Sequence, residues 1–228
     1  MHTKILEIAH TGFITAGVLD LPARFWPQPG QYLPCQRDAD HLQNLPTNLF
    51  RVLGPGERLY LAPLPNHWLP GDIIQTLSPH GRGFSLPPTA RRIGLLALDV
   101  APLRLLPLVN DALSQNAAVV LFWNAQQNHD ILHLLPAMVE VSPTTALLEN
   151  LDWLEYLAID MELTKRPALE SLLGTRTPPF EGQVLVRTSM PCRGIGECGV
   201  CAVKTPNGWK LSCIDGPVFN LQEVLHVA

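Results

Sequence analysis

Four of the five cysteines in this 228-residue chain lie between residues 192 and 213, in the stretch PCRGIGECGVCAVKTPNGWKLSC. Cys192, Cys198, Cys201 and Cys213 are spaced as C-x5-C-x2-C-x11-C. Thiols grouped this closely predict either disulfides or a shared metal centre. The first residues lack the basic head, apolar run and cleavage site of a secretion signal, so we expect a cytoplasmic protein whose thiols stay reduced. The pattern therefore favours a metal centre, and the local fold has to wrap around it.

The spacing is close to that of plant-type [2Fe–2S] proteins, in which C-x4-C-x2-C is followed by one distant cysteine. Gly194, Gly196 and Gly199 lie between the cysteines, where positive φ angles can bring backbone amides to the sulfurs, and Arg193 adds a positive charge. We predict that the four cysteines hold a [2Fe–2S] cluster. A zinc site, which usually shows two C-x2-C arms, and a degenerate empty site remain as alternatives. Cys35 stands alone and is assigned no role.

Changes in the pattern of apolar, proline and glycine residues divide the chain into three segments, 1–90, 91–178 and 179–228. Short apolar runs between prolines and glycines in 1–90 predict a β barrel or sandwich. An apolar run, a helical pattern and a second apolar run follow residue 91 and predict a βαβ unit of a parallel sheet. With 46 % apolar residues and a net charge of −4, the composition gives no reason to expect nucleic acid or an anionic membrane as partner. No apolar run is long enough for a membrane-spanning helix.

The segments SMPCRGIGECGVCAV and LSCIDGPVF resemble the C-terminal cluster domain of the electron-transfer subunit of class B dihydroorotate dehydrogenase, a branch of the ferredoxin reductase-like proteins. PGQY (29–32), PGDIIQTLSPHGRGF (70–84) and VAPLRLLPLV (100–109) are similar to landmarks of that family in the same order. The resemblance implies an FAD-binding-type barrel, a Rossmann-like parallel-sheet domain and a small [2Fe–2S] domain.

The resemblance also implies a function. Family members pass electrons between NADH and a separate FMN-containing catalytic subunit, so we expect a redox subunit of a hetero-oligomer in pyrimidine biosynthesis rather than a complete enzyme. Two other interpretations stay open. One is a non-catalytic assembly or binding subunit that kept the scaffold, and the other is a related subunit of another redox complex, such as a hydrogenase, serving a different flavoprotein partner.

The chain departs from the family where FAD is held. The family's Arg-Pro-x-Ser motif is replaced by LPTN (45–48), and its later Gly-Thr element is shortened to LPNHWLPGD. Without the arginine, a pyrophosphate loses its charge-assisted bidentate partner, which weighs against FAD. The remaining candidates for FAD contacts are Arg51, which is out of register, and Gly81, Arg82 and Gly83 of PHGRGF, a loop that could instead be a hairpin turn.

The chain also departs from the family where a dinucleotide would bind. The segment LLALDVAPL has no glycine after Gly94, and the side chains of Leu98 and Asp99 would crowd a dinucleotide phosphate. The family's Cys-Gly-Pro motif is replaced by LAIDMELTKRPAL. These changes weigh against NAD(H). His129 and His133 have helical i, i+4 spacing, yet with no third ligand in view they are interpreted as surface residues.

Overall fold

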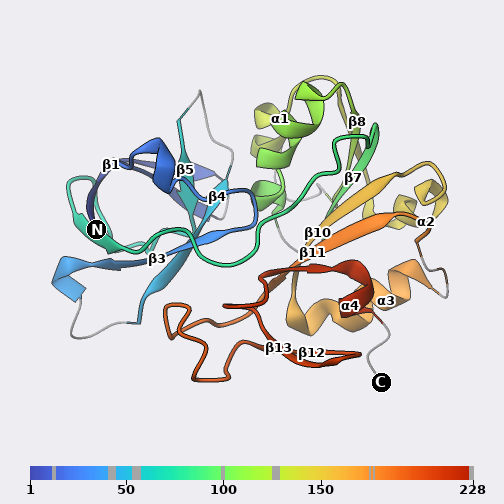
Figure 1. Ribbon diagram of the computed structural model, residues 1–228. Helices are drawn as coiled ribbons and strands as arrows, with labels where there is room; N and C mark the ends of the chain where they lie inside the picture. Colours follow the sequence, from blue (N-terminus) through green and yellow to red (C-terminus); the bar gives the residue numbers. More distant parts are fainter. Residues whose placement is uncertain are drawn as a thin grey trace.

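The chain folds into a barrel, an α/β layer and a C-terminal loop region, which follow one another in sequence (Figure 1). The computed structural model describes residues 1–11, 14–40, 45–52, 58–98, 101–124, 129–174, 176 and 178–225, with the backbone alone for residues 11, 129 and 130. None of the helices in these ranges is long and apolar enough to cross a membrane.

The N-terminal part is a closed antiparallel barrel with the strand order β1-β2-β5-β4-β3-β6. Its interior is filled by aliphatic side chains that alternate with outward-facing residues along the strands, including Ile5, Leu33, Leu49, Leu61 and Ile74, all fully buried. The strands are β1 (His2–Thr11), β2 (Ile14–Leu19), β3 (Tyr32–Arg37), β4 (Thr47–Val52), β5 (Tyr60–Ala62) and β6 (Ile73–Thr76).

The second part is a six-stranded sheet with the order β14-β11-β10-β7-β8-β9. All neighbouring pairs are parallel except β11 and β14, which pair antiparallel at one edge. The strands are β7 (Arg92–Ala97), β8 (Ala118–Phe122), β9 (Val139–Ser142), β10 (Tyr156–Glu162), β11 (Glu181–Arg187) and β14 (Val218–Asn220).

Helices cover both faces of this sheet, because its strands are apolar on both sides. Ile93 and Leu95 pack with α1 and with residues of the barrel, whereas Leu96 packs on the opposite face with α2, α3 and α4. One continuous core therefore joins the barrel to the sheet. The helices are α1 (Pro107–Ser114), α2 (Leu147–Asn150), α3 (Arg166–Leu173) and α4 (Leu221–Val224), with 3₁₀ turns at Ala23–Phe25, Asp38–Asp40, Pro102–Arg104, His129–Leu134, Thr144–Ala146 and Leu163–Lys165.

The cysteine-rich stretch lies between β11 and β14, below the sheet in Figure 1, and contains the hairpin of β12 (Ala202–Thr205) and β13 (Gly208–Leu211). The predicted combination of a β barrel and a parallel α/β sheet is confirmed. The domain limits near residues 90 and 179 stay predictions. β11 and β14 lie C-terminal to residue 179, and both extend the six-stranded sheet.

Candidate functional site

The hairpin of β12 and β13 brings the last two clustered cysteines together. Ala202 pairs with Leu211, so Cys201 just before β12 meets Cys213 just after β13, and their Sγ atoms are 3.3 Å apart. The backbone amide of Ser212 donates to the carbonyl of Cys201, which fixes this end of the hairpin. Both thiols are almost completely buried, with exposed fractions of 1 % and 2 %.

Backbone amides surround the sulfur of Cys192, the first of the clustered cysteines. Amides of Gly196, Gly194 and Ile195 hydrogen bond to the Cys192 sulfur and, led by that of Gly196, lower the pKa of its thiol to about 7. Gly194 and Gly196 both have φ of +84°, a conformation that glycine adopts without steric cost. Arg193 also has a positive φ, of +56°, so the residue added to the C-x4-C spacing is taken up in this turn.

The four thiols form one connected group. Cys192 hydrogen bonds to Cys198 on one side and to Cys213 on the other, and Cys213 contacts Cys201. Burial and the neighbouring Cys201 raise the pKa of the Cys213 thiol to about 12, and a coordinated metal would remove that proton. Cys198 is the exposed member of the group.

This arrangement fits a two-iron cluster better than a single metal ion. A structural zinc site usually takes its ligands from two C-x2-C arms, and only Cys198 and Cys201 form such an arm here. A [2Fe–2S] cluster instead takes two ligands on each iron, which suits thiols that are grouped in neighbouring pairs. The donor set of four cysteines with inward-facing amides therefore fits a [2Fe–2S] cluster.

The barrel contributes two residues beside the cysteine loop that sequence reasoning did not single out. The Tyr32 hydroxyl donates to the carbonyl of Cys213 over 3.4 Å. Burial, together with the nearby Cys213 thiol, raises the pKa of Tyr32. A Cβ on Gly194 would lie 2.7 Å from Cδ2 of His80, so the loop fits tightly against the His80 ring. The sequence signals were the presence of Tyr32 in the PGQY landmark and of His80 in PGDIIQTLSPHGRGF.

The PHGRGF loop packs against the C-terminal part of the chain. The Arg82 amide donates to the carbonyl of Gly216, and the Phe84 amide donates to the carbonyl of Pro29. A Cβ atom on Gly81 would lie 2.5 Å from Cδ of Pro217. The two segments approach so closely that a glycine is needed at this position. The hairpin interpretation is wrong, because the loop joins β6 and β7 of different sheets. FAD contacts by Gly81, Arg82 and Gly83 stay predictions.

The other predicted FAD residue lies apart from this loop. Arg51 is on β4. Burial raises the pKa of Asp111 on α1, and the positive charge of Arg51 partly offsets this by lowering the pKa. An FAD role for Arg51 also stays a prediction. The position of the missing family arginine is held by Leu45, whose side chain is 73 % exposed. Asp99 and the side chain of His129 lie outside the described residues.

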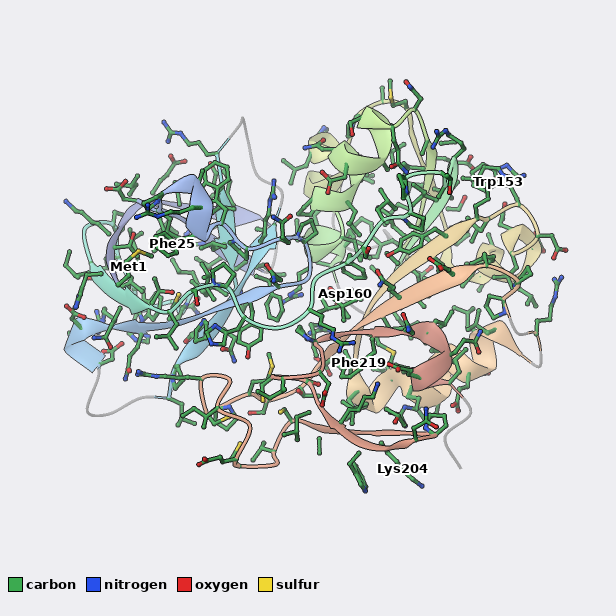
Figure 2. The ribbon with its side chains drawn as sticks, in the orientation of Figure 1. Met1, Phe25, Trp153, Asp160, Lys204 and Phe219 are labelled. Carbon is green, nitrogen blue, oxygen red and sulfur yellow. The ribbon has the colours of Figure 1, made fainter. Side chains whose placement is uncertain are left out.

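A cavity of about 290 Å³ lies between the barrel and the sheet, beside a buried ion network. The Asp160 carboxylate at the end of β10 is wholly buried at the centre of the molecule (Figure 2) and accepts from Arg187 Nε at 2.8 Å and Arg104 Nη1 at 3.4 Å. The Arg104 guanidinium also lies 5.4 Å from the centre of the Phe50 ring. The cavity is lined by Leu45, Pro46, Thr47, Asn48, Phe50, Pro63, Arg104, Arg187, Thr188, Ser189, Met190 and Pro191.

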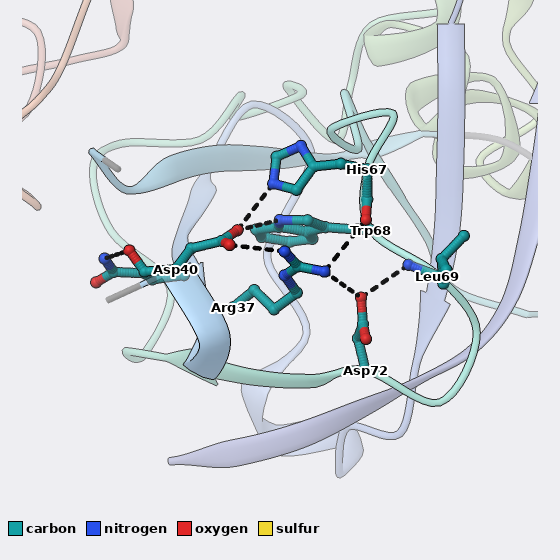
Figure 3. A network of polar contacts seen from close by, with 7 residues as sticks. Arg37, Asp40, His67, Trp68, Leu69 and Asp72 are labelled. Atoms are coloured by element: carbon teal, nitrogen blue, oxygen red, sulfur yellow. Dashed lines mark hydrogen bonds and ion pairs between the residues drawn. The ribbon is translucent and has the colours of Figure 1, made fainter. Parts of the chain in front are cut away.

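A second polar network occupies the segment that stands in place of the family's Gly-Thr element (Figure 3). Asp40 accepts hydrogen bonds from Arg37 at 2.7 Å, from His67 at 2.8 Å and from Trp68 at 3.3 Å. The space left beside this network is only about 20 Å³, enough for about one water molecule. Among the described residues, the cavity beside Asp160 has room for a flavin ring. The diphosphate of FAD would find no cation at residues 45–48 and no space near His67.

The closed barrel and the parallel sheet define a ferredoxin reductase-like fold, and the cysteine loop follows it at the C-terminal side. Residues 188–225 match the family described as the iron–sulfur cluster binding domain of dihydroorotate dehydrogenase B. All four clustered cysteines lie within this match.

Comparison of whole sequences points to the same family. The chain is 25 % identical over 201 residues to the electron transfer subunit of dihydroorotate dehydrogenase B (NAD(+)) from Desulforamulus reducens, covering 78 % of this chain and 73 % of the relative. The corresponding subunit from Clostridium perfringens is 26 % identical over 170 residues, covering 68 % and 67 %. A shorter match of 60 residues, 37 % identical and covering 26 % and 20 %, is to sulfhydrogenase 1 subunit gamma from Pyrococcus furiosus. The predicted resemblance is confirmed, and these identities make the chain a divergent relative.

Solved structures support the fold. An NADH-dependent reduced ferredoxin-NADP oxidoreductase superimposes with a TM-score of 0.70 at 15 % identity, covering 97 % of this chain and 88 % of that one. The ferredoxin reductase in carbazole 1,9a-dioxygenase gives a TM-score of 0.60 at 17 % identity, covering 78 % and 66 %. The predicted ferredoxin reductase-like architecture is therefore confirmed.

Proposed function

We propose that this protein is an electron-transfer subunit in which Cys192, Cys198, Cys201 and Cys213 hold a [2Fe–2S] cluster. The observation that carries the proposal is the connected group of four thiols with the amides of residues 194–196 directed at one sulfur. Amides directed at a thiolate offset its negative charge and tune the potential of the cluster. The match of residues 188–225 to an iron–sulfur domain supports the same assignment.

The surface around the cluster loop supports docking of a redox partner. Cys198 is exposed, and so are the apolar side chains of Ile195 and Val200 in the same loop and of Ile214, which lies against Gly196; these three are between 51 % and 65 % exposed. Apolar side chains gathered on a surface are typical of an interaction site. The proposed partner is an FMN-containing catalytic subunit or another flavoprotein, in a cytoplasmic hetero-oligomer of pyrimidine biosynthesis.

The chain's own residues would position the carrier rather than carry out bond chemistry. A [2Fe–2S] cluster supplies one-electron transfer, whereas a flavin handles two electrons. Tyr32 and the Cys201–Cys213 pair exclude water from the inner side of the loop, because all three are buried. Cys198 keeps the outer side within reach of a partner. The protein would thus act as a redox subunit and depend on a partner for substrate chemistry.

A second candidate is a related subunit of another redox complex, such as a hydrogenase. The 60-residue match to sulfhydrogenase 1 subunit gamma favours it. It shares the cluster and differs in the partner, so co-purification of the tagged protein from its native cells separates the two candidates. An FMN-dependent catalytic subunit in the eluate supports the first, and a hydrogenase subunit supports the second.

The cluster is tested by purifying the protein anaerobically and measuring iron, acid-labile sulfide and the visible and electron paramagnetic resonance spectra. We expect two irons and two sulfides per chain. Cys201→Ser should abolish or strongly weaken the spectrum, whereas Cys35→Ser, a buried thiol in the barrel core, is the matched control and should leave it unchanged. Absence of iron and sulfide after anaerobic reconstitution would contradict the proposal and support the assembly-subunit interpretation.

A further inference from the structure

The strand order of the parallel sheet shows where a dinucleotide would bind. β8 and β9 follow β7 on one side, whereas β10 and β11 are added on its other side. The connection after β7 leads to α1 on one face of the sheet, and the connection after β10 leads to α3 on the opposite face. Ligands of such sheets bind in the crevice that opens between two connections of this kind, outside the carboxyl ends of the strands. Here that crevice belongs to β7 and β10.

Backbone pairing and buried side chains close this crevice. Leu98, the residue after β7, donates its amide to the carbonyl of Asp160 at 3.0 Å, so β7 and β10 stay paired beyond the end of β7. The side chain of Leu98 is buried in the core on the α3 side of the sheet. On the other side, the Arg104 guanidinium lies 3.4 Å from the Asp160 carboxylate, and the two residues are only 7 % and 0 % exposed. The chain itself therefore takes up the space that a ligand would need.

The amides that a diphosphate would need are occupied. A helix N-terminus holds an anion through N–H groups that have no partner within the chain. At the start of α1, Pro107 has no N–H, and four amides around it donate to carbonyls of the same segment. These bonds run from Leu105 and Leu106 to Pro102, from Leu108 to Leu105 and from Val109 to Leu106, at 2.8 to 3.2 Å. Leu105 and Leu106 are also fully buried, so this end of the helix does not face a ligand.

The charges nearby give a diphosphate no free cation. Outside the ends of β10 and β11 lies a hollow of about 460 Å³, lined by Glu162, Leu163, Thr164, Arg187, Thr188, Ser189 and Val200. Arg187 is the one cation among these lining residues, and it already pairs with Asp160 at 2.8 Å and with Glu162 at 3.4 Å. Glu162 is half-exposed in the same hollow, and its negative charge would repel a phosphate.

We propose that this chain excludes NADH and NADPH, because Leu98, Arg104 and Asp160 close the crevice and the amides at the start of α1 are occupied. The relatives that it matches are named as NAD(+) enzymes, so the chain would differ from them in its electron donor. The inference deepens the proposed function and rests on it only for the presence of the cluster.

The electron donor is then a redox group held by another protein. One electron leaves a small reduced protein carrier, such as a ferredoxin or a flavodoxin, and enters the oxidised cluster, and no hydride or proton moves with it. The same electron later passes to the proposed flavoprotein partner. The exposed Cys198 and the nearby Val200, which is 57 % exposed, form the part of the cysteine loop that such a carrier would approach.

Nucleotide binding is tested on the full-length, cluster-loaded protein by anaerobic equilibrium dialysis with NADH and with NADPH. No saturable binding is expected at millimolar concentration. A dissociation constant below about 1 mM, the upper end of ordinary Michaelis constants, would overturn the exclusion. Iron, sulfide and the melting temperature are measured on the same samples. A folded protein without iron and sulfide would contradict the proposed cluster, while its dialysis would still measure nucleotide binding.

The electron donor is tested by following the visible absorbance of the cluster under argon. NADH and NADPH should leave it unchanged, whereas dithionite and a reduced ferredoxin or flavodoxin, freed of excess reductant, should bleach it. Val200→Asp should slow reduction by the protein carrier about 5-fold, the loss typical of one disrupted interface contact, and leave reduction by dithionite unchanged. Met138→Asp is the matched control, because Met138 is 71 % exposed beside β9, at the opposite edge of the sheet from β14, and should leave both rates unchanged.

Each outcome bears on one step of the proposal. Bleaching by NADH or NADPH without a second protein would overturn the exclusion of nucleotides. Bleaching by dithionite but by neither protein carrier would overturn electron exchange with proteins, and equal slowing in Val200→Asp and Met138→Asp would overturn the cysteine loop as the point of contact. An unchanged spectrum with both nucleotides, together with bleaching by a protein carrier that Val200→Asp slows, supports all three steps.

Discussion

At the scale of single residues, the cysteine loop is shaped by backbone angles that side chains rarely adopt. Arg193 has φ of +56° directly before Gly194 at +84°. For a residue other than glycine the left-handed conformation is costly, because its Cβ crowds the following carbonyl. The residue added to the usual C-x4-C spacing is thus accommodated with some strain, next to the first proposed cluster ligand.

We therefore expect Arg193→Gly to raise the free energy of unfolding by about 1 kcal/mol, since glycine adopts this angle without the steric cost. Urea unfolding of the reduced, cluster-free protein measures it without interference from cluster decay. Arg193→Val is the matched variant and should lower stability, because a β-branched residue fits this conformation worst. A less stable Arg193→Gly protein would show that the arginine side chain makes a contact that outweighs the strain.

At the scale of elements, the turn at Asp38–Asp40 is tied to the loop between β5 and β6 by one carboxylate. Hydrogen bonds from Arg37 and then from His67 hold the pKa of Asp40 well below its usual range. A carboxyl whose pKa is lowered on folding stabilises the fold above its unfolded pKa, near 4, and this stabilisation is lost as the pH falls through the lower, folded value.

The barrel should therefore lose stability as the pH falls below about 4, and Asp40→Asn should be less stable at pH 7 and show a shallower pH dependence in this range. Urea unfolding at pH 7, 4 and 3, followed by tryptophan fluorescence, measures both effects. Asp38→Asn, on the same turn, is the comparison variant. Equal pH dependence in the wild type and Asp40→Asn would contradict a stabilising role for the ionised Asp40.

The elements themselves were largely readable from the sequence, whereas the cavity was not. Turn residues between short apolar runs predicted the barrel, and two apolar runs flanking a helical pattern predicted the parallel sheet, because both signals are local. The cysteine spacing predicted the cluster loop for the same reason. Arg104, Asp160 and Arg187 come together from three separate segments, so their contact depends on the tertiary fold.

One signal of that contact was present in the sequence. Asp160 interrupts the apolar strand YLAIDME, and on β10 it faces the same side as Tyr156 and Ala158, toward the barrel. A carboxylate within a buried strand requires a cationic partner. The sequence did not identify the partner, since the chain contains several other arginines that could have paired with Asp160.

At the scale of the whole molecule, Asp160 lies where the barrel, the sheet and the segment leading to the cysteine loop meet (Figure 2). It holds Arg187, the last residue of β11, and through Arg104 it reaches Phe50 of the barrel. The relative placement of the cavity and the cluster loop therefore depends on one carboxylate.

Asp160→Asn should lower the free energy of unfolding by about 3 kcal/mol, because it leaves the buried Arg104 guanidinium without a counter-charge and removes the shorter of the two ion pairs of Arg187. Asp152→Asn is the matched control, since Asp152 pairs with Arg176 on the surface, where an ion pair contributes at most about 1 kcal/mol. Urea unfolding at pH 7 compares the two, with iron content measured on the same samples. If Asp160→Asn cost no more than Asp152→Asn, solvent or an anion would have to neutralise the arginines, and the placement of the cavity and the cluster loop would not depend on Asp160.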